Sequence, residues 1–95
     1  MKANLIAYDR QRFADGNLVE MTIWQLSARS NERPHGLKYS LFYGGPGGRI
    51  VGYDNERGKG DHRHYRDREE RYRFVDVEML VADFLRDVRR ERGGL

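Results

Sequence analysis

The chain has 95 residues, a length that suits one compact domain, so we predict a single domain over residues 1–95. It contains no cysteine, which excludes disulfides, iron–sulfur clusters and cysteine-based zinc sites. No apolar run approaches the roughly 20 residues that cross a bilayer, and residues 1–9 are too short and too polar a stretch for a signal peptide. We therefore expect a cytoplasmic protein with no membrane partner.

Arginine supplies most of the positive charge. The 18 cationic residues comprise 15 Arg and 3 Lys against 15 acidic residues, which gives a net charge of +3. A guanidinium grips phosphate with two parallel hydrogen bonds and stacks on bases, so this composition is compatible with a nucleic-acid partner. A genome rich in G and C, which favours Arg codons, explains the same composition without such a partner.

The N-terminal part predicts two antiparallel strands. Ala3–Asp9 is a short apolar–polar stretch, and Asp15–Asn17 has the turn chemistry of a tight reversal. Leu18–Ala28 then alternates between two faces and is rich in residues that suit a pleated surface. Within this second strand we expect Trp24 to be a core residue.

The middle of the chain predicts further strands separated by loops. Arg29–Gly36 is polar and contains a proline, so it is a loop, and the glycines of Gly44–Gly48 predict a reversal. The expected strands of this part are Leu37–Tyr43, Arg49–Asp54 and, in a very polar stretch, His62–Tyr65.

The C-terminal part predicts one long helix. Asp76 is a suitable N-cap, and apolar residues then recur at helical spacing to form one stripe: Val77, Leu80, Val81, Phe84, Leu85 and Val88. The other side is expected to hold the charged residues Asp83, Arg86, Asp87, Arg90 and Glu91. We therefore predict an α+β fold, an antiparallel meander of about four to five strands with this helix packed on one face.

Residues 52–65 do not look like scaffold, because two of the three histidines lie there. On a strand, His62 and His64 would point to the same side, together with Arg66. Histidine titrates near neutrality and can act as acid or base in RNA cleavage without a metal. Lys59, Arg63 and Arg66 are candidates to hold the phosphate.

A carboxylate is expected to orient one of the imidazoles, and both Asp61 and Asp54 are near enough in the sequence to do so. Zinc or manganese is an alternative ligand for the His-x-His pair with a nearby Asp. The surrounding arginines would repel a divalent cation and a second carboxylate is not obviously placed, so we predict neither a metal nor another cofactor. A second alternative is that both histidines are exposed residues of a charged hairpin.

Arg57 and Tyr53 complete the candidate nucleic-acid-binding set with Arg63 and Arg66. Tyrosine rings stack on bases, and Tyr53 is one of several tyrosines in the predicted strands. The alternative for these tyrosines is the half-buried face of the sheet.

The run Val51–His64, and above all its Gly-Lys-Gly-Asp-His-x-His stretch, resembles the central signature of the TumE-type toxins of bacterial toxin–antitoxin pairs. The opening around Glu20–Trp24 and the segment Tyr72–Phe74 before the helix are also similar, so the resemblance covers nearly the whole chain. It implies a toxin whose partner is a helix-turn-helix antitoxin that neutralises it by direct contact and represses the operon.

Together these observations predict a toxin that acts on RNA as a small metal-independent ribonuclease, with His62, His64, Lys59 and Asp61 as its catalytic residues. The alternative is a non-enzymatic module that binds nucleic acid or protein. Its affinity for nucleic acid would fall steeply as the salt concentration rises. Exposed sheet edges also make a homodimer physically easy.

Overall fold

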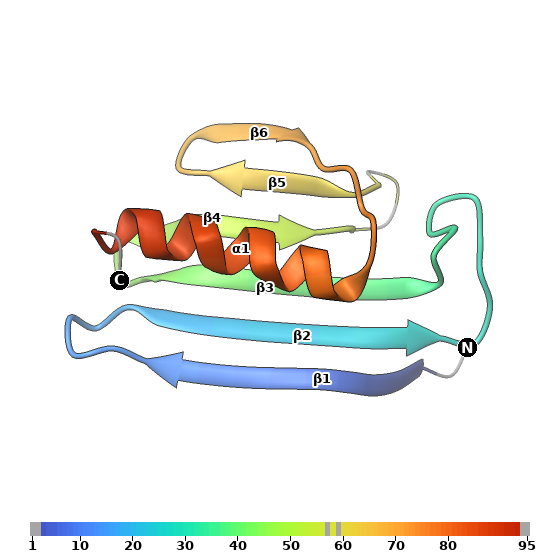
Figure 1. Ribbon diagram of the computed structural model, residues 1–95, viewed down its shortest axis with the longest axis horizontal. Helices are drawn as coiled ribbons and strands as arrows, with labels where there is room; N and C mark the ends of the chain where they lie inside the picture. The colour runs from blue at the N-terminus through green and yellow to red at the C-terminus, as the bar shows by residue number, and fades with distance from the viewer. Residues whose placement is uncertain (1–2, 57, 59, 94–95) are drawn as a thin grey trace.

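A computed structural model of the protein describes residues 3–56, 58 and 60–93, and shows six strands followed by one helix (Figure 1). The elements are β1 (Ala3–Arg12), β2 (Leu18–Leu26), β3 (Leu37–Gly45), β4 (Gly48–Asp54), β5 (His62–Tyr65), β6 (Arg68–Arg71) and α1 (Val77–Glu91). Each strand pairs antiparallel with the next in a single meander sheet of order β1-β2-β3-β4-β5-β6. The predicted α+β fold is confirmed, with slightly more strands than predicted.

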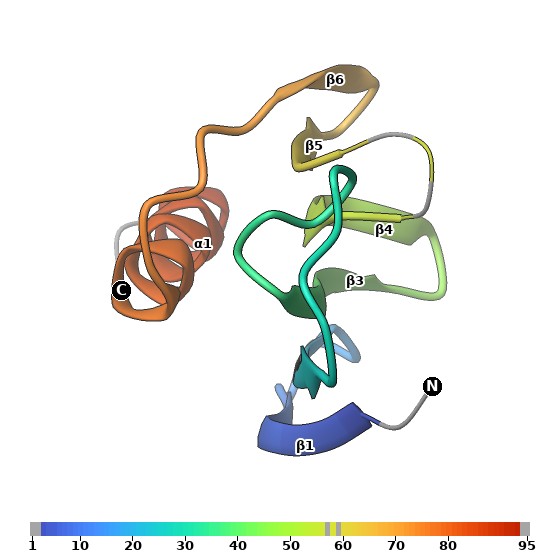
Figure 2. The ribbon, with the colours of Figure 1, turned by 90° about the vertical axis from the view of Figure 1, so that its right-hand side faces the viewer.

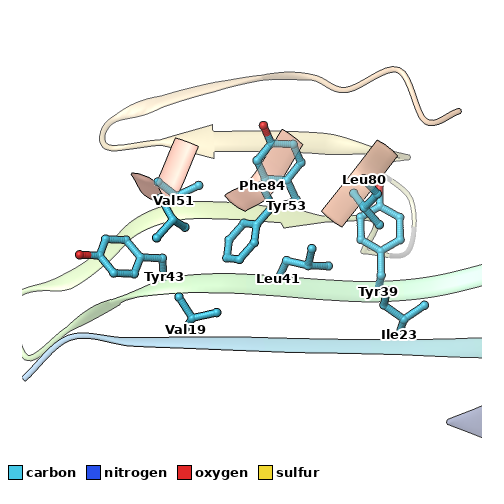
Figure 3. Close-up of a cluster of buried hydrophobic side chains, with 10 residues drawn as sticks. Val19, Ile23, Tyr39, Leu41, Tyr43, Val51, Tyr53, Leu80 and Phe84 are labelled. Carbon is cyan, nitrogen blue, oxygen red and sulfur yellow. The ribbon is translucent and has the colours of Figure 1, made fainter. Parts of the chain in front are cut away.

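The helix lies on one face of the sheet and makes the core there (Figure 2). Side chains alternate between the two faces of a strand, so every second residue of β2, β3 and β4 points toward α1. Figure 3 shows these inward side chains meeting the apolar stripe of the helix. The buried core consists of Val19, Ile23, Tyr39, Leu41, Tyr43, Val51, Tyr53, Leu80, Phe84 and Val88.

The helix begins and packs as its sequence predicts. The Asp76 carboxylate accepts a hydrogen bond from the backbone N–H of Met79 at 2.7 Å, which satisfies one of the free donors of the first turn. Leu80, Phe84 and Val88 of the apolar stripe are buried. Within the described ranges, α1 is the single helix and it is neither long nor apolar enough to cross a membrane.

Asp87 is an exception, because the prediction that it lies on the solvent side of α1 is wrong. It follows Leu80 by seven residues, or two helical turns, and therefore falls on the buried stripe. Its carboxylate accepts hydrogen bonds from the Tyr53 hydroxyl at 2.5 Å and from Arg63 Nε at 2.8 Å. Burial and the bond to Asp87 raise the pKa of the Tyr53 hydroxyl, which keeps this group protonated and donating.

Two further features differ from the sequence-based expectation. Trp24 is 36% exposed, because it points to the sheet face that α1 does not cover. Strand β6 was not predicted, because all four of its residues are charged and exposed. The turn that leads into it places Arg66 at φ 56°, a left-handed conformation in which glycine or asparagine is more common.

The buried ion pair predicts a specific pattern of stabilities. Arg63→Met leaves Asp87 buried without its cation and should lower the free energy of unfolding by about 3–5 kcal/mol. The double variant Arg63→Met/Asp87→Asn removes the unpaired charge while keeping an acceptor for Tyr53, so it should be more stable than Arg63→Met alone. Urea denaturation of the single and double variants measures both values.

Arg86→Met is the matched control, because the exposed Arg86 guanidinium pairs with Asp83 of the same helix at 3.0 Å and lies 3.9 Å from the Asp87 carboxylate, beyond hydrogen-bond distance. An exposed pair of this kind contributes about 0–1 kcal/mol, so this variant should stay close to the parent protein. The account of the buried pair would be contradicted by an Arg63→Met variant as stable as Arg86→Met.

Candidate functional site

The outer face of β4, β5 and β6 gathers imidazoles and carboxylates from three strands. Antiparallel pairing sets Asp54 of β4 opposite His62 of β5 and sets His64 of β5 opposite Glu69 of β6. Tyr53 and Arg63 are neighbours of these residues in sequence and bond to Asp87 of the helix. Strand alternation therefore turns Asp54, His62 and His64 to the face away from α1.

Four side chains form what we call the histidine–carboxylate cluster: Asp54, His62, His64 and Glu69. His62 Nε2 lies 2.8 Å from Asp54 Oδ1 and 3.4 Å from Glu69 Oε2. His64 Nε2 lies 3.7 Å from Asp54 Oδ2 and 3.4 Å from the same Glu69 oxygen. The two imidazole rings meet edge to face with centroids 4.8 Å apart. Both Nε2 atoms thus face the same two carboxylates.

The other ring nitrogens assign different tautomers to the two histidines. His62 Nδ1 lies 3.0 Å from the carbonyl oxygen of Gly60, which can only accept, so Nδ1 carries a proton. His64 Nδ1 lies 3.0 Å from Arg49 Nη2, which can only donate, so the proton of that neutral ring is on Nε2. Burial and the nearby Arg49 charge lower the pKa of His64.

Arg49 was not among the residues predicted from sequence. It lies at the start of β4 on the surface, and its side chain runs over Gly52 toward His64. A Cβ atom at Gly52 would lie 2.7 Å from Arg49 Cδ, so glycine provides the space for this path. A glycine inside a strand is the available signal, because it marks a close approach by another group.

Asn55 is a second residue that sequence analysis missed. Its buried side chain accepts from the N–H of Tyr39 at 3.0 Å and donates to the carbonyl of Leu37 at 2.7 Å. These bonds continue the β3–β4 pairing beyond the last residue of β4, which is Asp54. Asn55 therefore fixes the backbone that carries the Asp54 carboxylate.

Of the other predicted catalytic residues, Asp61 bonds elsewhere. Its carboxylate accepts from the Tyr39 hydroxyl at 2.6 Å and from His35 Nε2 at 3.0 Å, on the core side of the sheet. His35, from the loop between β2 and β3, packs on Phe74 with ring centroids 4.2 Å apart. The carboxylate that orients His62 in this structure is Asp54. Lys59 lies outside the described residues.

The predicted nucleic-acid-binding residues are spread over the molecule. Tyr53 is buried between Tyr72 and Phe84, so its ring has no face free for a base. Arg63 bridges Asp87 and Glu70 on the helix side. The Arg66 side chain is 64% exposed and pairs with Glu91. Arg57 lies outside the described residues.

Two surface hollows flank the cluster. One is lined by His62, Glu69, Glu70 and Arg71, which makes the cluster reachable from the surface. The other lies beyond Arg49, at the β3–β4 turn, and its lining includes Gly47, Gly48, Arg49 and Arg66. Arg49 therefore stands between a groove that contains Arg66 and the imidazole of His64.

Comparison with known proteins agrees with the resemblance noted in the sequence. The family model described as Toxin TumE matches residues 3–92, nearly the whole chain. No curated protein and no solved structure matches the chain. Because the family match covers all six strands and the helix, the chain belongs to the TumE toxin family and is the toxin component of a toxin–antitoxin pair.

Proposed function

We propose that this toxin cleaves RNA and that the histidine–carboxylate cluster is its reacting centre. The observation that carries the proposal is the convergence of two imidazoles on two carboxylates at 2.8–3.7 Å, on an accessible face and beside the exposed Arg49. A structural hairpin does not need two imidazoles that converge on two carboxylates, because a single partner satisfies each buried polar group. Perturbed and mutually facing ionisable groups are instead typical of reacting centres.

RNA cleavage requires a group that removes a proton from the attacking hydroxyl, a group that protonates the leaving oxygen, and cations for the phosphate. In the metal-free reaction predicted from sequence, His62 and His64 divide the first two roles. In each ring Nε2 is the nitrogen that would transfer a proton, because Nδ1 of His62 faces the Gly60 carbonyl and Nδ1 of His64 faces Arg49; Asp54 must release His62 Nε2 for this step. Arg49 provides a cation next to His64.

The arrangement of arginines supports a path for the RNA backbone. The glycine-lined groove next to Arg49 allows close approach of a sugar–phosphate chain, and Arg66 borders the same groove. Arg71 lies at the far side of the cluster, where it lines the hollow beside His62. We propose that Arg49 and Arg66 hold phosphates on one side of the reacting centre and that Arg71 holds one on the other.

Replacing both histidines tests the reacting centre. The double variant His62→Ala/His64→Ala should lose RNA cleavage by at least about 100-fold and should no longer inhibit growth, because both proton-transfer groups are removed. Purified protein is incubated with a labelled RNA of mixed sequence, and circular dichroism verifies that the variant keeps its fold.

His35→Gln is the control, because His35 is a histidine paired with an aspartate on the core side of the sheet. It should retain cleavage. A double variant as toxic as the parent protein would end the assignment of the cluster. Parent protein that binds RNA without cutting it would favour the alternative function, a non-enzymatic binding module.

Arg49 should contribute to RNA binding through phosphate. Arg49→Met keeps an unbranched side chain over Gly52 and removes the charge, so RNA affinity should fall and the slope of log affinity against log salt should decrease by about one. Fluorescence anisotropy at several salt concentrations measures the slope. Arg89→Met on the exposed side of α1 is the control and should leave the slope unchanged; an equal decrease in both variants would count against a phosphate role specific to Arg49.

We also propose that the antitoxin is a helix-turn-helix protein that neutralises the toxin by direct contact, and that β1 is its docking strand. All ten residues of β1 are exposed, and the described ranges pair this strand with β2 alone. Its apolar Leu5, Ile6 and Tyr8 are among the most exposed large hydrophobic residues. An open edge with exposed apolar side chains suits strand addition by a partner.

Ile6→Lys should weaken the toxin–antitoxin complex by at least about tenfold, because it places a charge in the proposed contact. Light scattering and titration of the two purified proteins measure the complex. Lys38→Ala, on the outer face of β3, is the control and should bind normally. A toxin that forms a stable homodimer through β1 would assign this edge to a second copy instead.

A further inference from the structure

We infer that the histidine–carboxylate cluster binds a divalent transition cation of the zinc class through Asp54, His62, His64 and Glu69. The binding does not depend on what the protein does, whereas a catalytic role for the cation rests on the proposed cleavage of RNA. A bound cation would replace the metal-free reaction predicted from the sequence.

Asp54, His62 and His64 each offer a donor atom within 4.8 Å of the others, and Glu69 Oε2 lies 3.4 Å from both Nε2 atoms. Zinc bonds to histidine nitrogen and carboxylate oxygen are about 2.0–2.2 Å long, which places neighbouring donors about 3.3–3.6 Å apart. Two of the nitrogen–oxygen distances in the cluster, both 3.4 Å, fall within that range, one is shorter at 2.8 Å and one is longer at 3.7 Å. A cation can therefore enter between the donors with small side-chain movements.

The tautomer of His62 is the one that a metal ligand requires. Its Nδ1 proton is donated to the Gly60 carbonyl, so Nε2, which lies 2.8 Å from the Asp54 carboxylate, is the nitrogen left for a metal ion. Two acceptors this close need a positive charge between them, either a proton or a metal ion. A bond from Nδ1 to a backbone carbonyl is the usual outer support of a metal-bound histidine.

The structure removes one of the two reasons for which the sequence argued against a metal. The second carboxylate is Glu69, which comes from the unpredicted strand β6. Of the nearby arginines, Arg63 bonds to Asp87 under the helix and Arg66 pairs with Glu91, which leaves Arg49 beside the cluster. Two carboxylates with two neutral imidazoles carry a charge of −2, which one divalent cation balances.

Arg49 opposes the cation in this arrangement. It donates to His64 Nδ1, which leaves the proton of the neutral ring on Nε2, the atom that faces the carboxylates. A metal at His64 Nε2 therefore requires the ring to release this proton and Arg49 to move away. Arg49 lies on the surface, so it is free to turn toward solvent or toward a phosphate held at the cation.

A cation at this position would supply Lewis-acid chemistry to the proposed reaction. It would neutralise charge that develops on the scissile phosphate in a site flanked by Glu69 and Glu70. Without it, these carboxylates repel an approaching phosphate.

Isothermal titration of the metal-stripped full chain with zinc chloride, and separately with manganese chloride, tests the site. The parent protein should bind one zinc ion. Asp54→Asn should weaken binding by at least about 100-fold, since even outer-shell substitutions cost about 10–100-fold. Arg49→Met should bind about tenfold more tightly, because a positive charge and a competing donor are lost.

Asp61→Asn is the matched control, because Asp61 also pairs with a histidine, His35, at 3.0 Å but belongs to no group of three metal-ligating side chains among the described residues. It should bind zinc like the parent protein. Zinc should also raise the melting temperature of the parent protein and of Asp61→Asn, but not that of Asp54→Asn. Because each protein is compared with and without zinc, a small loss of stability caused by the substitution itself does not affect this test.

The inference is overturned if the parent protein shows no saturable one-to-one binding, or if Asp54→Asn binds as tightly as Asp61→Asn. RNA cleavage assayed in parallel with EDTA separates the two proposals. Zinc binding without cleavage supports the cation site and contradicts the proposed function. Cleavage that persists in EDTA, by a protein that does not bind zinc, supports the proposed function and overturns the cation site.

Discussion

The ion pair between Arg63 of β5 and Asp87 of α1 determines the arrangement of the functional face. A carboxylate that is fully buried must be paired, and Arg63 donates a hydrogen bond to it at 2.8 Å. Because side chains alternate along a strand, an inward Arg63 forces its neighbours His62 and His64 to point outward. A shift of one residue in the pairing of β5 would therefore leave the buried Asp87 carboxylate without its cation. It would also turn both imidazoles toward the core.

The same alternation operates in β4. Tyr53 points inward and donates to Asp87, while Asp54 points outward to His62. One register of strand pairing thus places the core residues on one face of the sheet and the histidine–carboxylate cluster on the other. The free energy gained by burying the core therefore also fixes the position of the cluster. Substitutions that loosen the packing of α1 should disturb the cluster without touching any of its residues.

The cluster also depends on the edge of the sheet. Glu69 comes from β6, a strand of four charged and exposed residues that the backbone pairing with β5 holds in place. The ligand set is therefore made of a well-anchored part, Asp54 and His62, and a more exposed part, Glu69. An arrangement of this kind allows one carboxylate to move aside when a substrate approaches, while the buried imidazole stays fixed.

Periodic and local signals in the sequence were sufficient to predict the α+β fold, the capped helix and the position of His62 and His64 on one face of their strand. Each of these depends on spacing within one element. Of the two carboxylates expected to orient an imidazole, Asp54 lies next to His62 and Asp61 does not, because Asp54 is directly across the strands from His62.

The other differences have similar causes. Glu69 was missed because its strand carries no apolar residue, and Arg49 because its role depends on the space left by Gly52. Asp87 was misplaced because charge was given more weight than its seven-residue spacing from Leu80. In each case the position of the side chain depends on how the elements pair, which a single sequence does not show.

The most direct test of the account is the protonation state of the imidazole nitrogens, read from a long-range ¹H–¹⁵N correlation spectrum during a zinc titration. The account predicts that His62 carries its proton on Nδ1, that its Nε2 resonance shifts when zinc is added, and that His35 keeps its proton on Nε2 throughout. A His62 ring with no proton on Nδ1, or an Nε2 resonance indifferent to zinc, would contradict this assignment.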